Sequence, residues 1–211
     1  HPAPPHDLEA RLGVGAPESA GGTGGGLVDL ACLVEECARG LVPRPVTGAI
    51  RAIAVLAALD PAQPVLADLV AGKKRLALAF DEETARTPDG WTTKVSGDGA
   101  NAKVDGAKAY VPDALDADLH LVALRDGAGT SLVLVENRAP GAVARAVKTF
   151  GGDRQAHVEY EAAPIVAWVG ARGKADAALA SLWRRQVALA LAEMVGGMDA
   201  VLELAVAYVK E

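Results

Sequence analysis

Residues 104–112 read VDGAKAYVP, and this stretch decides how the middle of the chain is expected to fold. Apolar residues alternate with polar or small ones on both sides of an Asp-Gly pair, as in strands that bury one face. Asp-Gly also suits the positive φ angles that a type I′ turn requires. The stretch therefore predicts two antiparallel strands, Ala102–Val104 and Ala107–Val111, joined by a tight hairpin at Asp105-Gly106.

The same alternation extends in both directions, over residues 73–169. Short β-rich runs recur there at intervals of roughly 8–12 residues, between turn signals such as Pro-Asp-Gly at 88–90. Besides the hairpin, the expected strands are Arg75–Phe80, Trp91–Val95, Leu119–Leu124, Ser131–Val135, Ala142–Val147, His157–Tyr160 and Ile165–Val169. Because no helices alternate with these strands, the pattern predicts an antiparallel β-sandwich or barrel and argues against a Rossmann-type sheet.

Helical periodicity flanks this β block on both sides. Apolar residues recur at helical spacing over 27–41, where Pro43 ends the helix, and two further helices are expected over 47–58 and 63–70. From Ala175 onward the spacing predicts one long amphipathic helix, in which Gly196-Gly197 indicates close approach of another helix. The expected fold class is α+β.

Three domains are expected from this order of patterns. They are an N-terminal helical part over 1–72, a middle β domain over 73–170, and the first long helix of a C-terminal helical bundle over 171–211. Both ends of the chain have the composition of interrupted segments, which predicts a longer native protein.

The composition excludes several classes of protein. The chain has 211 residues, 51% of them hydrophobic, so it is not disordered as a whole. A net charge of −6, from 21 basic and 27 acidic residues, argues against a nucleic-acid-binding face. No apolar run approaches the ~20 residues of a membrane span. Cys32 and Cys37 are too few for a disulfide framework, and reading them as buried, reduced thiols favours a cytoplasmic protein.

Motifs for phosphate binding, metal binding or hydrolysis are absent from the sequence. The Gly21–Gly26 loop lacks the strand-to-helix setting of a nucleotide cradle, which favours a flexible entry to the next helix. The four histidines, His1, His6, His120 and His157, have no metal-ligand spacing. His120 and His157 are instead expected at half-exposed sheet positions, so no metal site is predicted.

Block by block, the chain resembles the acyl-CoA dehydrogenase family of flavoproteins. LGVGAPESAGG at 12–22 and VEECAR at 34–39 resemble that family's first loop and the end of its first helix. ALAFD at 77–81 lies where the family has its TEP motif, and DGAKAYVP at 105–112 where it has NGxKxW(I/V)T. ADLHLVA at 117–123 is similar to the strand that follows, and residues 186–209 resemble the first long helix of the C-terminal bundle.

The resemblance implies a cofactor and a set of residues that face it. In that family FAD lies between the β domain and the C-terminal helices, and an acyl-CoA thioester stacks on its ring and is oxidised between the α and β carbons. Carried over to this chain, the cofactor-binding positions are Leu78, Phe80, Tyr110, Val111 and Pro112.

The chain departs from the family pattern at several of these positions. Phe80 and Pro112 stand where the family has threonines, so two hydroxyl donors are lost, and Tyr110 stands where it has tryptophan. Arg86 lies near the position of a family serine, where it is either a phosphate partner or an exposed cation. Losing two or three hydrogen bonds weakens binding by roughly 10- to 1,000-fold.

The implied function is that of an oxidoreductase in fatty acid or lipid metabolism, acting on CH–CH groups of an acyl-CoA with FAD. The resemblance puts the catalytic base beyond Glu211, so no catalytic residue is assigned here; Glu193 faces either a cavity or solvent, and Glu203 is expected to be solvated. A homo- or hetero-oligomer, dimer or tetramer, is expected. The alternatives are a non-catalytic partner subunit with a degenerate flavin site and a related flavin-dependent oxidase or monooxygenase.

Overall fold

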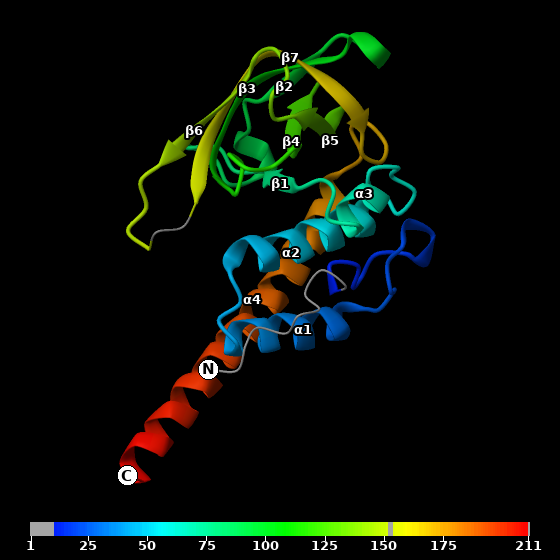
Figure 1. The fold of residues 1–211 in the computed structure, drawn as a ribbon. Coiled ribbons are helices and arrows are strands. Elements are labelled where there is room, and N and C mark those ends of the chain that lie inside the picture. The colour runs from blue at the N-terminus through cyan, green and yellow to red at the C-terminus, as the bar shows by residue number, and fades with distance from the viewer. Residues whose placement is uncertain (1–10, 152–153, 211) are drawn as a thin grey trace. The chain divides into compact units, whose positions relative to one another are not determined.

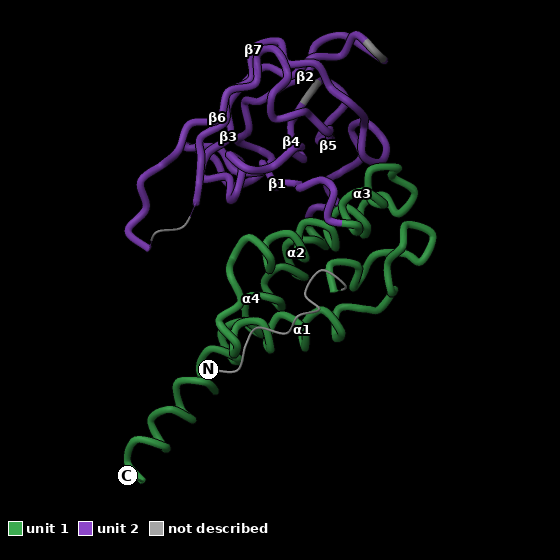
Figure 2. Tube along the Cα trace, viewed as in Figure 1, with its two compact units in different colours: residues 1–71, 180–211 green, residues 72–179 purple. Residues whose placement is uncertain are grey.

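The computed structural model describes residues 11–151 and 154–210, so His1 and His6 lie outside the described residues. The chain divides into two compact units, residues 1–71 with 180–211, and residues 72–179 (Figure 2). The first unit is helical and the second consists mainly of strands (Figure 1). The α+β fold class is confirmed, while the division into three domains stays a prediction.

In the part of the chain that the structure describes, four α-helices form the helical unit and its connection to the strands. They are α1 (Leu27–Arg39), α2 (Arg44–Leu59), α3 (Leu66–Val70) and α4 (Asp176–Lys210), preceded by the 3-10 turn η2 (Glu18–Ala20). The Asp29 carboxylate accepts the Gly26 N–H at 2.6 Å, which satisfies one of the free donors at the start of α1. The second expected helix starts earlier than predicted, at Arg44, because Pro45 lies in its first turn, where a missing N–H costs nothing.

The core of this unit brings α1, α2 and α4 together. Its buried residues are Leu30, Leu33, Val34, Cys37, Ile50, Ala54 and Leu189. Between α2 and α4, the Arg51 guanidinium donates to Glu193 at 3.0 Å and to the Gln186 side chain at 3.2 Å. Among the described residues, no helix is both long enough and apolar enough to cross a bilayer.

The two cysteines of α1 differ in environment. Cys37 is buried and burial raises the pKa of its thiol, whereas Cys32 is exposed. The prediction that both thiols are buried is therefore wrong for Cys32, because this residue lies on the solvent side of the helix.

Gly196 and Gly197 do not interrupt α4, and the first of them confirms the expected close approach. A Cβ on Gly196 would lie 2.0 Å from the carbonyl oxygen of Glu35 in α1, whereas a Cβ on Gly197 would meet nothing within 4 Å. Two helix backbones can come this near only where one side chain is a hydrogen atom. The pair therefore contains one packing glycine and one that no contact requires.

Over the described residues of the second unit, seven strands form the sheet. They are β1 (Leu76–Ala79), β2 (Lys94–Ser96), β3 (Lys103–Pro112), β4 (Leu119–Asp126), β5 (Gly129–Glu136), β6 (Ala142–Val147) and β7 (Gln155–Trp168), with 3-10 turns η3 (Pro88–Gly90) and η4 (Gly99–Asn101). The hydrogen-bonded order is β1-β4-β5-β7-β3-β2, and β6 pairs with β7. All pairs are antiparallel except β1 with β4, which run parallel, so the sheet is mixed rather than purely antiparallel.

The predicted hairpin at Asp105-Gly106 is wrong, because β3 continues through it. A register shift against β7 lies between Val104 and Gly106, whose φ is +140°. The Asp105 carboxylate accepts the N–H of Ala162 on β7 at 2.8 Å, and a Cβ on Gly106 would lie 2.6 Å from the Thr93 Cα. The dipeptide thus forms a bulge, in which the left-handed conformation lets one backbone pass close to another.

The two strands expected over 157–169 are also a single strand, β7.

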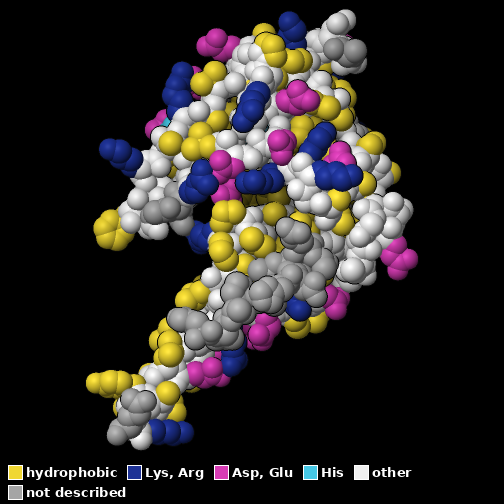
Figure 3. All heavy atoms as spheres, in the orientation of Figure 1, with side chains coloured by type: hydrophobic (Ala, Val, Ile, Leu, Met, Phe, Trp, Pro, Cys, Tyr) yellow, Lys and Arg dark blue, Asp and Glu magenta, His cyan; other side chains and the backbone are white. Residues whose placement is uncertain are grey.

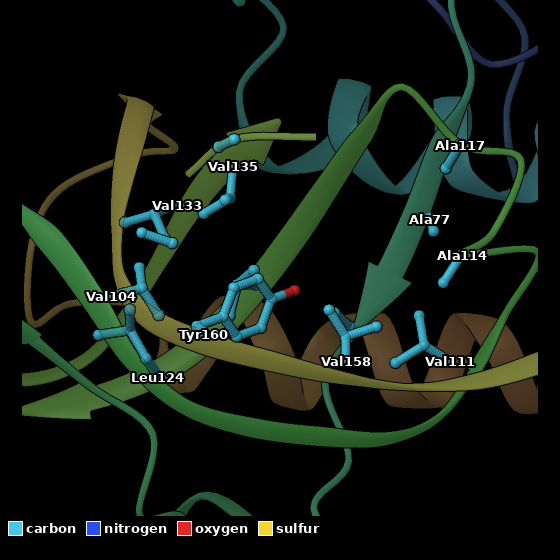
Figure 4. Packing of buried hydrophobic residues seen from close by; sticks show 14 of the residues in the cluster. Ala77, Val104, Val111, Ala114, Ala117, Leu124, Val133, Val135, Val158 and Tyr160 are labelled. Atoms are coloured by element: carbon cyan, nitrogen blue, oxygen red, sulfur yellow. The ribbon is translucent and has the colours of Figure 1, made fainter. Parts of the chain in front are cut away.

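The core of the second unit is made of small and β-branched side chains around one tyrosine (Figure 4). Tyr160 is 2% exposed, and its hydroxyl lies 3.0 Å from Nδ1 of His120, which is fully buried. Nε2 of His120 lies 3.3 Å from the Ala114 carbonyl, which can only accept, so Nε2 carries the proton and Nδ1 accepts from Tyr160. The prediction of a half-exposed position therefore fails for His120 and holds for His157.

Acidification should destabilise this core through His120. Burial lowers the pKa of His120, against the hydrogen bond to Ala114, so below about pH 6.5 the unfolded chain binds a proton that the folded chain refuses. The free energy of unfolding should then fall as pH decreases from 6.5, by at most about 1.4 kcal/mol per pH unit from this group. Urea unfolding of wild type and His120→Gln between pH 7 and pH 5 measures this difference. Equal pH slopes in the two proteins would contradict the assignment.

Candidate flavin-binding rim

The five predicted cofactor-binding residues fall on two neighbouring stretches of the second unit. Leu78 is partly buried on β1, and Phe80, directly after β1, is also partly buried. Tyr110 and Pro112 are exposed near the end of β3. Val111, by contrast, is 1% exposed and belongs to the core, so only its main chain is available to a ligand. We call Phe80 and Tyr110 the rim.

The two stretches are connected although β1 and β3 are not neighbours in the sheet order. The N–H of Ala109 donates to the carbonyl of Asp81 at 2.8 Å, and the Lys108 ammonium donates to the carbonyl of Phe80 at 3.0 Å. The segment that follows β1 therefore lies along β3 and is attached to it immediately before Tyr110.

Tyr110 has an unusual backbone for an aromatic residue in a strand. Its φ is +53°, and a register shift against β7 lies between Lys108 and Val111. Its ring is 41% exposed and stands edge-on to the imidazole of His157, with 5.1 Å between ring centroids. Bulges re-aim side chains and are enriched beside functional sites, and strained backbone has the same tendency. This one presents an aromatic ring on the surface.

A buried ion pair lies below the rim. Lys108 Nζ is 3.0 Å from Oε1 of Glu82, and the side chains of the two residues are 0% and 5% exposed. Glu82 also accepts the N–H and the hydroxyl of Thr92, both at 2.8 Å, and the N–H of Thr93 at 3.0 Å. The ammonium group of Lys108 lies 4.5 Å from the centroid of the Trp91 ring. Every charge of this cluster therefore has partners.

The environment keeps this pair ionised at neutral pH. Burial alone would raise the pKa of Glu82, but hydrogen bonds from Thr92 and Thr93 and the charge of Lys108 outweigh it and lower that pKa to about 2. Burial lowers the pKa of Lys108 to about 8, against the opposing effect of Glu82. Both groups are therefore charged at pH 7.

Sequence reasoning did not identify the Glu82–Lys108 pair. Within 107–111 the apolar residues Ala107, Ala109 and Val111 alternate with Lys108, so the local pattern predicts that the lysine side chain points outward. The charge of lysine and its ordinary place on a surface favour the same prediction.

Three buried polar atoms around the rim have no hydrogen-bond partner among the described residues. They are Oδ1 of Asp81, Nε1 of Trp91 and Nε2 of His157. Asp81 follows Phe80, Trp91 contacts Lys108, and His157 contacts Tyr110. Burial raises the pKa of Asp81, while the charge of Arg86 opposes this effect. Unpaired buried polar groups are uncommon and are a feature of functional sites.

The other candidate residues have ordinary roles. Glu193 is bound to Arg51, and Glu203 forms an exposed ion pair with Arg39. Arg86 is exposed. Within residues 11–151 and 154–210, no three His, Cys, Asp or Glu side chains gather in a way that could hold a metal ion.

Comparison with known proteins finds partial similarity to acyl-CoA dehydrogenases and a shared fold. No family model matches the sequence. The acyl-CoA dehydrogenase FadE34 of Mycobacterium tuberculosis is 41% identical over 70 residues, which are 33% of this chain and 9% of that protein. The solved Tcur3481–Tcur3483 steroid ACAD G363A variant matches 97% of this chain and 56% of its own, with 29% identity and a TM-score of 0.82.

A third match supports the fold alone. The structure described as the FAD complex of PigA covers 95% of this chain and 59% of its own, with 18% identity and a TM-score of 0.84. The chain thus spans somewhat more than half the length of the solved structures that it resembles, and a small part of the curated relative. Local sequence identity and near-complete structural overlap agree, so the chain is similar to part of an acyl-CoA dehydrogenase.

Proposed function

We propose that this chain is an acyl-CoA dehydrogenase-like flavoprotein, which binds FAD at the rim and oxidises an acyl-CoA thioester between its α and β carbons. The observation that carries the proposal is Tyr110, an exposed aromatic ring held at a φ of +53° by a bulge in β3. A strained, exposed ring gains nothing for the core, so its conformation is best explained by a flat ligand.

The residues present fit a flavin, though with fewer polar contacts than the family pattern supplies. Tyr110 offers a ring face, and the buried polar atoms of Asp81 and His157 without partners lie beside the rim. Phe80 offers apolar contact in place of a hydroxyl, and Pro112 has no N–H to donate. Main-chain groups at 78–80 and at Val111 are the remaining donors and acceptors for the ring edge.

In this mechanism the chain's own residues orient the reactants and exclude water. Tyr110 would stack on the isoalloxazine, Phe80 would cover its edge, and Leu78 would contribute main-chain contacts. When bound, FAD supplies the oxidant that accepts the two electrons removed from the acyl group. The resemblance puts the proton-abstracting base beyond Glu211, and Glu193, the candidate on α4, is bound to Arg51. We therefore assign the base to none of the described carboxylates.

We also propose that the protein is an oligomer that binds acyl-CoA. Large apolar side chains are exposed along α4 from its middle to its end, including Leu191, Met198, Leu202 and Tyr208 (Figure 3). A row of exposed apolar residues of this length favours contact with further protein. The other chain in such a contact is either a second copy or a homologous subunit.

Replacing the rim tyrosine should weaken flavin binding. Tyr110→Ala removes the stacking face, which is worth about 2- to 12-fold in the dissociation constant for FAD. Quenching of flavin fluorescence on titration with the purified chain measures this constant. Phe150→Ala, which removes a fully exposed aromatic ring outside the rim, is the matched control and should bind FAD like wild type.

Two outcomes would contradict the proposal. A colourless preparation that takes up no added FAD and copurifies with a second homologous chain would favour a non-catalytic partner subunit. Because the resemblance puts the catalytic base beyond Glu211, activity is measured on a protein that also carries the later helices; bound flavin there without oxidation of any acyl-CoA would favour a related oxidase or monooxygenase.

A further inference from the structure

Lys108 is charged and completely buried, and the proposed function gives it no role. Its side chain is 0% exposed, and its ammonium group contacts Glu82, the Phe80 carbonyl and the Trp91 ring. Replacing a buried ion pair by apolar side chains of similar volume is often neutral or stabilising, so stability alone does not explain such a pair. A second reason for keeping a buried ion pair is that it fixes one conformation of the segments that it joins.

The contacts of Lys108 join three stretches of chain that are distant in sequence. The lysine is on β3, Phe80 and Glu82 follow β1, and Glu82 in turn accepts three hydrogen bonds from Thr92 and Thr93, which precede β2. β1 and β3 share no ladder, so these side-chain bonds supplement the one main-chain bond from Ala109 to Asp81.

Both residues of the rim are attached to this junction. Phe80 is held through its own carbonyl oxygen, at 3.0 Å from Nζ. Tyr110 lies two residues after Lys108, inside the register shift that ends at Val111. Fixing Lys108 on Phe80 therefore fixes where the bulge starts and how the main chain of Phe80 lies relative to that of Tyr110.

We infer that Lys108, through Glu82 and the Phe80 carbonyl, is a positioning residue that holds Phe80 and Tyr110 in the geometry that accepts the flavin. The inference rests on the proposed function for its ligand and on the described contacts for its geometry. The fixed charge of the pair gives the junction one arrangement, whereas an apolar side chain would fill the space without fixing the carbonyl.

The test compares Lys108→Met with the double variant Lys108→Met/Glu82→Gln. The single variant leaves the Glu82 carboxylate buried without its cation and can fail to fold. The double variant removes both charges, and its amide oxygen can still accept from Thr92, whose two donors bind Oε2 of Glu82. Its NH2 group faces the Thr93 N–H, which binds Oε1, so the melting temperature should fall, though by less than in the single variant. Lys103→Met, an exposed lysine on the same strand, is the matched control.

Two readouts are measured on the full chain. The dissociation constant for FAD should rise by about 10- to 150-fold in the double variant, as expected for a lost charged hydrogen bond, and stay unchanged in Lys103→Met. Without FAD, amide hydrogen exchange over 80–82 and 109–112 should be faster in the double variant than in wild type.

The two readouts separate failure of this inference from failure of the proposed function. A double variant with the melting temperature, FAD affinity and exchange rates of wild type would overturn the inference. If wild type binds no FAD, the proposed function fails, and the exchange comparison alone decides: faster exchange at both segments supports the positioning role, and unchanged exchange overturns it.

Discussion

Gly106→Ala should lower the free energy of unfolding by about 2–5 kcal/mol. The new Cβ would lie 2.6 Å from the Thr93 Cα and 2.7 Å from its hydroxyl oxygen, on a residue whose φ is +140°. Steric overlap with main chain and an unfavourable φ add here, because neither can relax without moving β3 away from the segment before β2. Chemical denaturation at neutral pH measures the loss.

The matched control for this prediction is Gly127→Ala. Gly127 is exposed in the turn between β4 and β5, and a Cβ there would meet nothing within 4 Å. Its replacement should change the free energy of unfolding by less than about 0.5 kcal/mol. Equal losses in the two variants would mean that Gly106 does not lie against Thr93, as in a free hairpin turn.

Gly196→Ala should destabilise the helical unit by about 1–3 kcal/mol, although alanine is the better helix former. Its Cβ would lie 2.0 Å from the Glu35 carbonyl oxygen, so α1 and α4 would have to separate. Thermal unfolding followed by circular dichroism at 222 nm would show the change as a lower melting temperature.

Replacing the neighbouring glycine, Gly197, should have the opposite effect on stability. Gly197→Ala meets no atom within 4 Å, so the gain in helix propensity should stabilise the protein by about 0.5–1 kcal/mol. Destabilisation by both replacements would contradict the assignment of one packing glycine and one replaceable glycine.

The sequence predicted the order of elements well because hydrophobic periodicity is a local property. The alternation over 119–124, 131–135 and 142–147 corresponds to β4, β5 and β6, and the long apolar repeat from Ala175 corresponds to α4. The prediction of a turn at Asp105-Gly106 failed because its outcome depends on contacts that are not local. The same dipeptide satisfies a turn or a bulge, and contacts with Thr93 and Ala162, which are distant in sequence, select the bulge.

The candidate site, too, was predicted only in part from the sequence. The motifs carried by the family resemblance pointed to Phe80 and Tyr110, but gave no sign that Val111 is buried or that Glu82 and Lys108 form a buried pair. A carboxylate and an ammonium group 26 residues apart can each be satisfied by water in the unfolded chain. Only burial makes each the required partner of the other.

By itself, then, the amino-acid sequence determined the order of helices and strands and carried the resemblance to acyl-CoA dehydrogenases, since both depend on spacing along the chain. The tertiary structure decided the parallel pairing of β1 with β4, the strain at Tyr110 and the partners of Lys108. The physical reason is that main-chain geometry and charge compensation depend on which distant segments exclude water together, and no local pattern specifies that.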